Sequence, residues 1–413
     1  MESIKKAGLI LLAGLIFSRL GGTLFKFIAI YHLTPLEYGK LALFLIMFNW
    51  LLLIATFNTT LGLAKFVAEK RSKKELLYGS ALLGSTIISL FISGLLILFS
   101  NQISLFIGLG SIPIILFLAA VLPFAVVYNI TIFYFRGLYR MKASTLSDVA
   151  LSAAKVILLI FLFYVGYNYP PYFAFLIAHM LIDLVLIFKG KLPKRIASIN
   201  MIKIKKGLIN YRMLLIYSFP IFIAEITRFL GLGIDRFFLA KFFTTSATGI
   251  YDLGISLCIG YLVIANSYAN ALLPVASRNH RNVSRLKTSL FKSTGYVVVL
   301  YVLYTMAILF FIEPLVNLIN PLYIEVTTFV LPLMVVYALI GFLSLLTHFA
   351  SAIALQKYAA YASAVFLILA FTLNFYLVPE LKYLGAVEAL LASSLASLVL
   401  LMLMIWRGLK SRR

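Results

Sequence analysis

Three cations lie deep inside long apolar stretches, and their positions are the first indication of chemistry. Arg19 follows Lys6 by 13 residues, which on a helix rising about 1.5 Å per residue is a displacement of roughly 20 Å. Lys26 lies two helical turns farther along on the same side, and the stretch contains no acid to neutralise either residue. Arg228 is a similar deep cation in the second half of the chain. Cations at membrane depth need a cavity or a partner, and arginine holds phosphate with paired hydrogen bonds, so these three residues are predicted to bind a phosphate or pyrophosphate.

Amide side chains in the same kind of stretch are candidates for binding hydroxyl groups. Asn58 lies seven residues before Lys65, and Asn266 and Asn270 are one helical turn apart. Each amide could line a cavity and bind a neutral part of a ligand. Hydrogen bonds between neighbouring helices are an equally good interpretation, so both remain open.

Acids in the apolar stretches could bind a coupling ion or pair with the cations. Asp183 is a lone acid that could pair with Lys155 or Arg19, and Glu225 lies three residues before Arg228. We therefore regard Asp183, Glu225 and Lys155 as candidates for ion coupling or for ion pairs that lock helices together. No motif decides between these roles.

Two further groups of polar residues follow helical spacing or adjacency. Asp148, Ser152 and Lys155 recur at intervals of four and three residues, which places them in one polar stripe. Asp235 and Arg236 are adjacent and lie near the outer end of their stretch, where we expect water to solvate them.

Membrane-spanning helices must position all of these residues. The 413-residue chain is 63% hydrophobic and 12% charged, with a mean hydropathy of +1.05, which excludes a soluble globular enzyme and a disordered basic segment. A span needs about 20 mostly apolar residues. The sequence therefore predicts an all-α polytopic membrane protein with 12 transmembrane helices, the first of which is no cleaved signal peptide. The predicted spans are 7–31, 39–64, 76–100, 111–135, 146–167, 171–188, 213–240, 247–274, 288–312, 326–350, 358–378 and 384–406.

Lysine and arginine are divided unequally between the two sides of the predicted membrane. Of the 36 such residues, 27 fall on the side of the N-terminus and three, Lys40, Lys241 and Lys382, fall on the opposite side. Because positive loops remain in the cytoplasm, both termini are placed there, in a multi-pass protein of the cell membrane. The net charge of +23 is then explained by cytoplasmic loops that face anionic lipids, and no nucleic-acid partner is expected.

The longest hydrophilic stretch divides the chain into two lobes of six predicted helices each. The N-terminal lobe is expected at 1–188 and the C-terminal lobe at 213–413. The basic linker at 189–212 mixes lysine with isoleucine, methionine and leucine, which is compatible with a solvated linker or with an interfacial segment on the lipid headgroups.

The two predicted lobes look like copies of one repeat. Arg19 aligns with Arg228 and, with a gap of one residue, Gly39 before its span aligns with Gly249. Because both lobes start on the same side of the membrane, a pseudo-two-fold axis along the membrane normal must relate them. Parallel repeats of this kind usually enclose a central cavity.

The sequence lacks the motifs of several enzyme classes. It contains no GxxxxGK[ST] loop and no HExxH pattern, its four histidines are scattered, and its single cysteine, Cys258, cannot form a disulfide within the chain. We therefore predict no catalytic activity, no metal site and no cofactor, and we interpret Cys258 as a packing residue.

These features together resemble one known family. The segment GLILLAGLIFSRLGGTLFKFIAIYHLTPLEYGKLALF, with Arg19 and the turn of Pro35, Tyr38 and Gly39, resembles polysaccharide-exporting flippases of the multidrug/oligosaccharidyl-lipid/polysaccharide exporter superfamily. The segments TGIYDLGISL and LLPVAS of the second half resemble the same family, and the resemblance covers essentially the whole chain.

The resemblance implies a substrate and a mechanism. Such proteins move a polyprenyl-phosphate- or pyrophosphate-linked oligosaccharide to the outer leaflet by alternating access, for surface polysaccharide or glycan biosynthesis. By position, Arg19 and Arg228 would be ligands of the headgroup phosphate and Lys26 an accessory cation. Glycosyltransferases or a polymerase could act beside such a protein.

Three other functions are weaker interpretations. A cation or drug antiporter of the same superfamily needs an acid in the cavity of the first lobe, where Asp183 is the only deep one. A carrier of the major facilitator type would show Gly-x-x-x-Asp-Arg between its second and third helices, where this chain has AEKRSKKE. A scaffold that recruits glycosyltransferases has no use for arginines at mid-membrane. Export of a lipid-linked oligosaccharide is therefore the favoured prediction, with the antiporter as the alternative.

Overall fold

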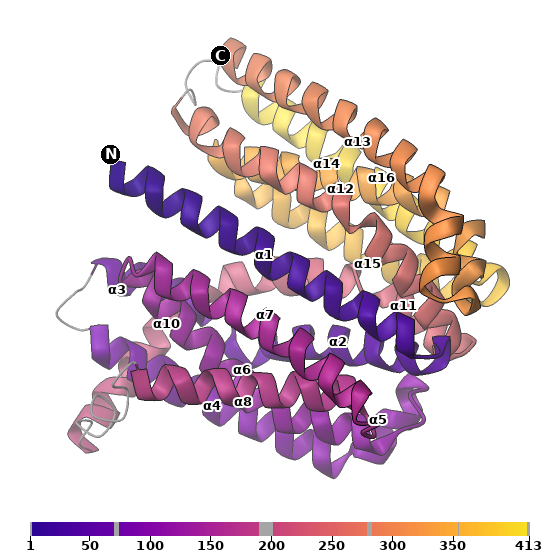
Figure 1. The fold of residues 1–413 in the computed structure, drawn as a ribbon. Coiled ribbons are helices and arrows are strands. Elements are labelled where there is room, and N and C mark those ends of the chain that lie inside the picture. The colour runs from indigo at the N-terminus through magenta and orange to yellow at the C-terminus, as the bar shows by residue number, and fades with distance from the viewer. Residues whose placement is uncertain (1, 70–73, 190–200, 279–282, 354, 411–413) are drawn as a thin grey trace. The chain divides into compact units, whose positions relative to one another are not determined.

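The computed structural model describes residues 2–69, 74–189, 201–278, 283–353 and 355–410, and these residues are helical almost throughout (Figure 1). They form fifteen α-helices and one 3-10 helix, η2. Helices are the expected solution for this composition, because a membrane offers the backbone no water to bind and a helix satisfies its N–H and C=O groups internally.

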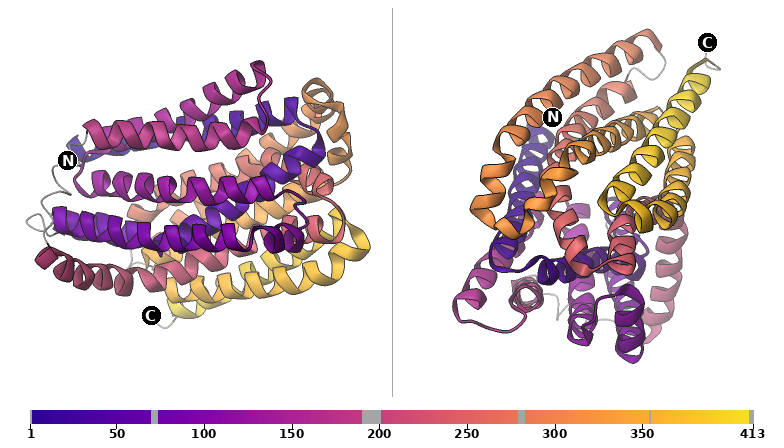
Figure 2. Two further views of the ribbon diagram at one scale, coloured as in Figure 1. Left: turned by 90° about the horizontal axis from the view of Figure 1, so that it is seen from below. Right: turned by 90° about the vertical axis from the view of Figure 1, so that its right-hand side faces the viewer.

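The chain divides into two compact units, and each is described by itself. Unit 1 comprises Met1–Leu33 and Lys40–Ile226, and unit 2 comprises Thr34–Gly39 and Thr227–Arg413. Unit 1 contains α1 (Glu2–His32), α3 (Thr59–Glu69), α4 (Lys74–Leu98), α5 (Ser100–Ile107), α6 (Ile112–Gly137), α7 (Met141–Tyr164), α8 (Pro170–Lys189), and most of α2 (Pro35–Thr56) and α10 (Met201–Gly231). Unit 2 contains α11 (Ile234–Phe242), α12 (Thr245–Arg278), α13 (Val283–Ile319), η2 (Pro321–Thr328), α14 (Val330–Ala352), α15 (Gln356–Leu381) and α16 (Tyr383–Lys410). The helices of each unit run side by side, as the two views of Figure 2 show.

The lengths of the helices fit the predicted spans. Eleven segments of the described residues are long and apolar enough to cross a membrane. The helix α1, with 31 residues, occupies the position of the first predicted span, although the side chains of its first half lie outside the described residues. The short stretch 171–188 is also a helix, since α8 covers it.

Two of the predicted spans are interrupted. The stretch 39–64 is divided into α2 and α3 at Phe57 and Asn58, whose φ angles are 45° and 53°. Two consecutive left-handed residues cannot continue a right-handed helix, so the chain changes direction there. The stretch 213–240 is divided into α10 and α11 by a turn at Leu232 and Gly233.

The C-terminal part of the predicted basic linker is helical. Residues 190–200 of this linker lie outside the described residues, whereas α10 begins at Met201 and continues to Gly231. The boundary between the two compact units lies inside α10, between Ile226 and Thr227. The lobe boundaries at 188 and 213 and the interfacial position of the linker stay predictions.

Glycines allow the helices of unit 1 to approach each other. A Cβ atom at Gly62 of α3 would meet the hydroxyl of Ser218 on α10 at 2.9 Å, and one at Gly84 of α4 would meet the ring of Tyr211 at 2.6 Å. Small residues at helix contacts are typical of membrane proteins, where dispersion contacts replace the hydrophobic effect as the driving force. These contacts attach α10 to α3 and α4.

Candidate functional site

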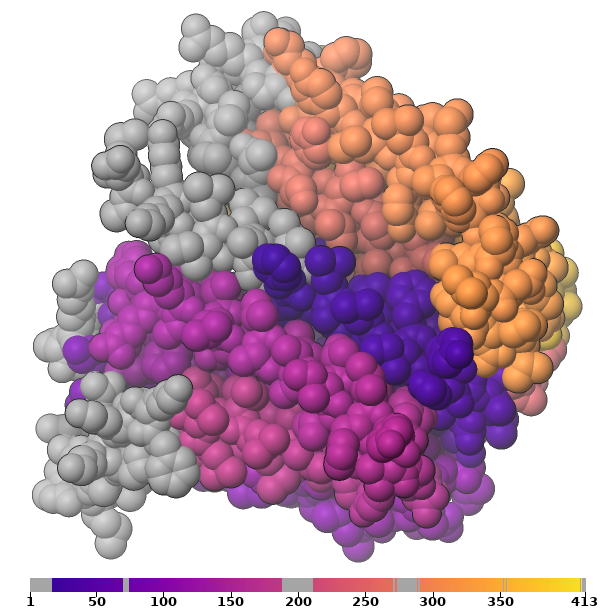
Figure 3. All heavy atoms as spheres, in the orientation of Figure 1, coloured from indigo at the N-terminus to yellow at the C-terminus, as the bar shows by residue number. Residues whose placement is uncertain are grey.

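One side of α1 is packed within unit 1. The hydroxyl of Ser152 on α7 donates a hydrogen bond of 3.1 Å to the backbone oxygen of Ser18. One turn farther along, Gly21 gives room to the side chain of Ser152, and the ring of Phe25 lies edge-on to that of Phe175 with centroids 6.3 Å apart. Helix α1 therefore lies beside α7 (Figure 3), and positions 18, 21 and 25 define its packed side.

Arg19 and Lys26 lie on a different side of α1. A helix turns by about 100° at each residue, so Arg19 points away from the side that Ser18 presents to α7. Arg19 is exposed, and it makes no hydrogen bond or ion pair with the residues that the structure describes. Lys26, two turns later, is half-buried on the same side. The predicted pair of cations therefore shares one helix face.

The predicted polar stripe of α7 contacts three different helices. Asp148 binds Arg136 of α6 at 2.9 Å, Ser152 binds Ser18 of α1, and the ammonium of Lys155 lies 3.6 Å from the ring centroid of Phe175 on α8. The last contact is a cation–π interaction, which stabilises a cation without an acid. The stripe therefore forms no single site within unit 1.

Asp183 is a buried acid of α8. Its side chain belongs to a residue that is 3% exposed, and neither carboxylate oxygen has a hydrogen-bond partner among the described residues. His179, one turn earlier on the same side, is buried with its Nδ1 atom 2.8 Å from the backbone oxygen of Phe175. In the described part of the chain neither Lys155 nor Arg19 pairs with Asp183, and its part in ion coupling stays a prediction.

The three predicted amides differ in their surroundings. Asn58 lies in the break between α2 and α3, is 8% exposed, and its Nδ2 atom has no partner among the described residues. Asn266 of α12 accepts a hydrogen bond of 2.7 Å from the hydroxyl of Ser344 on α14, which favours the helix–helix interpretation for this residue. Asn270 is also in α12, and its side chain lies outside the described residues.

Glu225 and Arg228 lie near the end of α10. Glu225 is half-buried, whereas Arg228 is exposed and its guanidinium carbon lies 4.9 Å from the ring centroid of Phe229. Glu225 belongs to unit 1 and Arg228 to unit 2. The roles predicted for Glu225 in ion coupling and for Arg228 in phosphate binding stay predictions.

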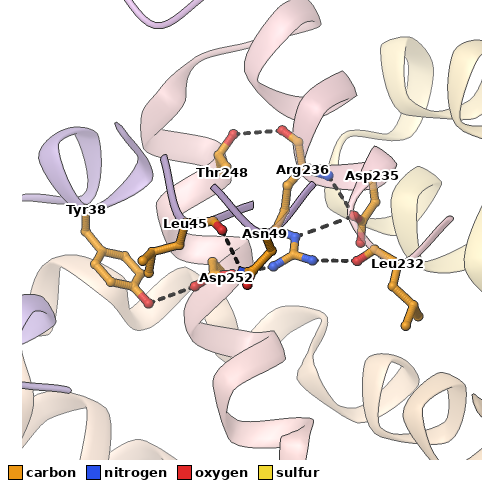
Figure 4. A network of polar contacts seen from close by, with 8 residues as sticks. All are labelled: Tyr38, Leu45, Asn49, Leu232, Asp235, Arg236, Thr248 and Asp252. Carbon is orange, nitrogen blue, oxygen red and sulfur yellow. Dashed lines mark hydrogen bonds and ion pairs between the residues drawn. The ribbon is translucent and has the colours of Figure 1, made fainter. Parts of the chain in front are cut away.

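Arg236 is the centre of a buried polar network in unit 2 (Figure 4). Its Nη1 atom donates to Oδ1 of Asp252 at 2.7 Å, its Nη2 atom donates to the backbone oxygen of Leu232, and its backbone N–H donates to Oδ1 of Asp235 at 2.8 Å. Oδ2 of Asp252 accepts a hydrogen bond of 2.8 Å from the phenol of Tyr38, in the first turn of α2.

The expectation that water solvates Asp235 and Arg236 is therefore wrong. The side chains of Arg236, Asp235 and Asp252 are 11%, 0% and 1% exposed. The turn before α11 places Arg236 against α12, and Asp252 of α12 supplies the opposite charge that burial requires. Sequence reasoning missed Asp252, although an acid inside a predicted span was a usable signal.

A second network in unit 1 accounts for Arg136. The sequence placed this arginine in a cytoplasmic loop, but it lies in the last turn of α6, where its Nε atom donates to the hydroxyl of Ser144 at 2.9 Å. Asp148 accepts both from Arg136 and, at 2.6 Å, from the phenol of Tyr128. No sequence pattern indicated that Tyr128 takes part. Arg136 and Arg236 thus bind acids, whereas Arg19 binds none among the residues that the structure describes.

Within the part of the chain that the structure describes, no three His, Cys, Asp or Glu side chains gather so that they could hold a metal ion. The thiol of Cys258 is buried in α12.

Solved structures with this fold match nearly the whole chain, and three of them are described here. An inward-facing multidrug resistance MATE family transporter of the MOP superfamily matches with a TM-score of 0.74 and 16% identity, over 96% of this chain and 95% of that chain. The lipid II flippase MurJ, in an inward closed conformation, matches with a TM-score of 0.75 and 14% identity, over 96% and 87%. A mutant of the Vibrio cholerae MATE transporter VcmN matches with a TM-score of 0.66 and 16% identity, over 100% and 99%.

These matches define the fold. At 14–16% identity they show the fold alone: the chain has the all-α fold of these MATE and MurJ membrane proteins, and the predicted arrangement of 12 helices in two lobes fits them. Residues 32–320, more than half of the chain, match the family model described as "Polysaccharide biosynthesis protein", and the chain belongs to this family. The predicted membership of the polysaccharide branch is thereby confirmed. No curated protein matches the chain significantly.

Proposed function

We propose that this protein is a flippase that moves a polyprenyl-(pyro)phosphate-linked oligosaccharide across the cytoplasmic membrane by alternating access, for the biosynthesis of a surface polysaccharide or glycan. Membership of the polysaccharide biosynthesis family supports the substrate class. A fold shared with a protein described as a lipid II flippase is compatible with the movement of a large lipid-linked headgroup.

The observation that carries this proposal is the exposed position of Arg19 and its lack of a partner among the described residues. It is exposed on a helix of membrane-spanning length, and the residues that the structure describes give it neither a hydrogen bond nor an ion pair. Arg136 and Arg236, by contrast, each bind an acid at 2.9 Å or less. A guanidinium at this depth needs a cavity or a partner, and a phosphate accepts its N–H groups in pairs.

The proposed headgroup site combines three cations. Arg19 binds the phosphate next to the sugar, and Lys26 on the same helix face adds charge. Arg228, the counterpart of Arg19 in the second half, meets the headgroup in the course of transport. Asn58 and Asn270 are the amides that we propose for hydroxyl groups of the sugar, while the bond from Ser344 to Asn266 makes Asn266 a weaker candidate.

The distribution of charge supports a proposed orientation in the membrane. Both termini and the basic loops lie in the cytoplasm, where the loops bind anionic lipids. The glycosyltransferases that build the lipid-linked substrate, or a polymerase that consumes it, are the partners that this chemistry implies.

A cation or drug antiporter is the second candidate. The observation that favours it is Asp183, a buried acid without a hydrogen-bond partner among the described residues, because an antiporter needs an acid to bind its coupling cation. Two of the three solved structures named above are described as MATE transporters. In the flippase, the same acid would couple transport to an ion gradient.

The two functions can be separated in proteoliposomes that contain the purified protein. Transport of a fluorescent polyprenyl-pyrophosphate oligosaccharide is compared with efflux of a cationic dye. We expect Arg19→Met to lower oligosaccharide transport by about tenfold or more, the scale of one charge-assisted hydrogen bond, and Arg19→Lys to retain part of it. Arg140→Met, which removes an exposed arginine between α6 and α7, is the matched control and leaves transport unchanged.

Two results would contradict the proposal. If Arg19→Met transported the oligosaccharide as well as the parent protein, Arg19 would be no phosphate ligand. If the parent protein exported the dye and left the oligosaccharide in place, the antiporter would be the correct function.

A further inference from the structure

Helix α2 carries one polar side chain that its neighbours leave uncovered. All residues from 41 to 60 are described, and Asn49 is the only one of them that is exposed. The rings of Phe44 and Phe48 lie edge-on to that of Phe175 on α8, with centroids 5.6 and 4.8 Å away. Asn49 follows Phe48 by one residue, which is about 100° of helical rotation, so its side chain points away from this packed side.

The amide of Asn49 has a fixed orientation. Its Nδ2 atom donates a hydrogen bond of 2.7 Å to the backbone oxygen of Leu45, in its own helix. Because a carbonyl oxygen can only accept, this contact identifies which end of the amide is the nitrogen. The other end, Oδ1, has no hydrogen-bond partner among the residues that the structure describes. Asn49 therefore offers an acceptor to a donor group from outside the protein.

Helices α1 and α2 meet at one aromatic ring of unit 1. The ring of Phe25 on α1 lies 6.3 Å from that of Phe175, the same ring that α2 contacts. Helix α1 ends at His32 and α2 begins at Pro35, so the connection is too short for anything but a reversal of direction. The two helices therefore run in opposite directions past Phe175, which serves as a common reference level.

This reference places Asn49 between the two cations of α1 along the helix axes. Arg19 precedes Phe25 by six residues, which is about 9 Å, and Lys26 follows it by one, about 1.5 Å in the opposite direction. Because α2 runs the other way, Asn49 lies about 1.5 Å from Phe48 on the side of Arg19. Its level thus falls between those of Lys26 and Arg19.

The three side chains also share an orientation relative to α8. Arg19 and Lys26 are rotated by about 100–120° from Phe25, and Asn49 by about 100° from Phe48. Each therefore points away from the ring of Phe175 that both helices cover. Arg19 and Asn49 are exposed there, and polar groups at membrane depth need polar surroundings. Asn49 is thus suited to a polar ligand that also reaches the cations.

We propose that Asn49 binds the first sugar of the lipid-linked oligosaccharide, the one bonded directly to the diphosphate. A hydroxyl or an acetamido N–H of this sugar donates to Oδ1 while Arg19 holds the phosphate. The inference rests on the proposed function and adds to it a contact that distinguishes the sugar-bearing lipid from the bare polyprenyl diphosphate.

Native mass spectrometry with two probes tests this contact. One probe is polyprenyl diphosphate, and the other is the same lipid carrying a single N-acetylglucosamine. We expect Asn49→Leu to bind the sugar-bearing lipid about three- to tenfold more weakly than the parent protein, the scale of one hydrogen bond, and to bind the bare diphosphate equally well. Asn101→Leu, at an exposed asparagine of α5, is the matched control and binds both probes as the parent does.

The substitution is chosen to leave folding intact, because Asn49 is exposed and its hydrogen bond lies within its own helix. Unfolding by SDS should confirm equal stability of Asn49→Leu and the parent. If Asn49→Leu bound the sugar-bearing lipid as tightly as the parent, or weakened both probes equally, the inference would fail while the proposed function remained. If the parent bound neither probe, both would be overturned.

Discussion

Replacement of Arg236 by methionine should destabilise the protein strongly. The side chain of Arg236 is 11% exposed, and its two acidic partners, Asp235 and Asp252, are 0% and 1% exposed. Methionine has a similar length but no charge, so the variant would leave two buried carboxylates without a cation. Breaking a buried ion pair from one side costs about 3–5 kcal/mol. We expect the free energy of unfolding to fall by that amount.

Equilibrium unfolding in mixed lipid–detergent micelles, driven by SDS and followed by the fluorescence of Trp50 and Trp406, measures this loss. Asp252→Asn should also destabilise the protein, and the double variant should lose less than the sum of the single losses, because the two side chains are in contact. The matched control is Arg19→Met, which removes an exposed arginine. It should change the free energy of unfolding by no more than about 0.5 kcal/mol.

Either of two results would refute this reasoning. A change below about 0.5 kcal/mol for Arg236→Met would mean that its ion pairs contribute nothing to stability. A loss of about 3 kcal/mol for Arg19→Met would mean that Arg19 is a structural residue, and the argument for phosphate binding would lose its basis.

Three further predictions test other parts of the structure. Asp148→Asn weakens the contacts to Arg136 and should lower the free energy of unfolding by about 1–3 kcal/mol in the same assay, and an unchanged value would contradict the network in unit 1. A Cβ atom at Gly39 would overlap the backbone oxygen of Thr245, so Gly39→Ala should nearly abolish the yield of folded protein on size exclusion. Gly22→Ala, which has open space around it, should leave the yield unchanged. Equal yields of the two variants would contradict the close contact between Gly39 and Thr245. Asp183→Asn should remove the effect of a proton or sodium gradient on transport and leave transport without a gradient intact, and a persisting gradient effect would exclude Asp183 as the coupling acid.

Much of the fold follows from the sequence because hydropathy has a direct physical meaning in a membrane. Apolar runs long enough to cross a bilayer have few alternatives to a helix, and even the short stretch 171–188 became α8. The break at Phe57 and Asn58 has no such signal. Its left-handed backbone depends on packing far along the chain, such as the contact of the Phe57 ring with Phe222 at 4.8 Å.

For the candidate site, the sequence predicted which residues share a face of one helix, but not which residues of other helices they contact. Helical spacing correctly placed Arg19 and Lys26 on one face of α1. It could not show which neighbour each residue of a stripe would meet, and Asp148 and Lys155 contact α6 and α8 instead of sharing a site. The partner of a charge on another helix depends on how the helices pair, and a single sequence does not contain that information.

Direct binding of the headgroup to Arg19 tests the central claim. Native mass spectrometry of the purified protein would compare a polyprenyl diphosphate with the uncharged polyprenol, for the parent protein, Arg19→Met and the control Arg140→Met. We predict that Arg19→Met binds the diphosphate about tenfold more weakly or worse, that Arg140→Met binds it normally, and that the uncharged lipid binds equally to all three. Equal binding of the diphosphate to the parent protein and Arg19→Met would contradict the claim that Arg19 holds the phosphate of the substrate.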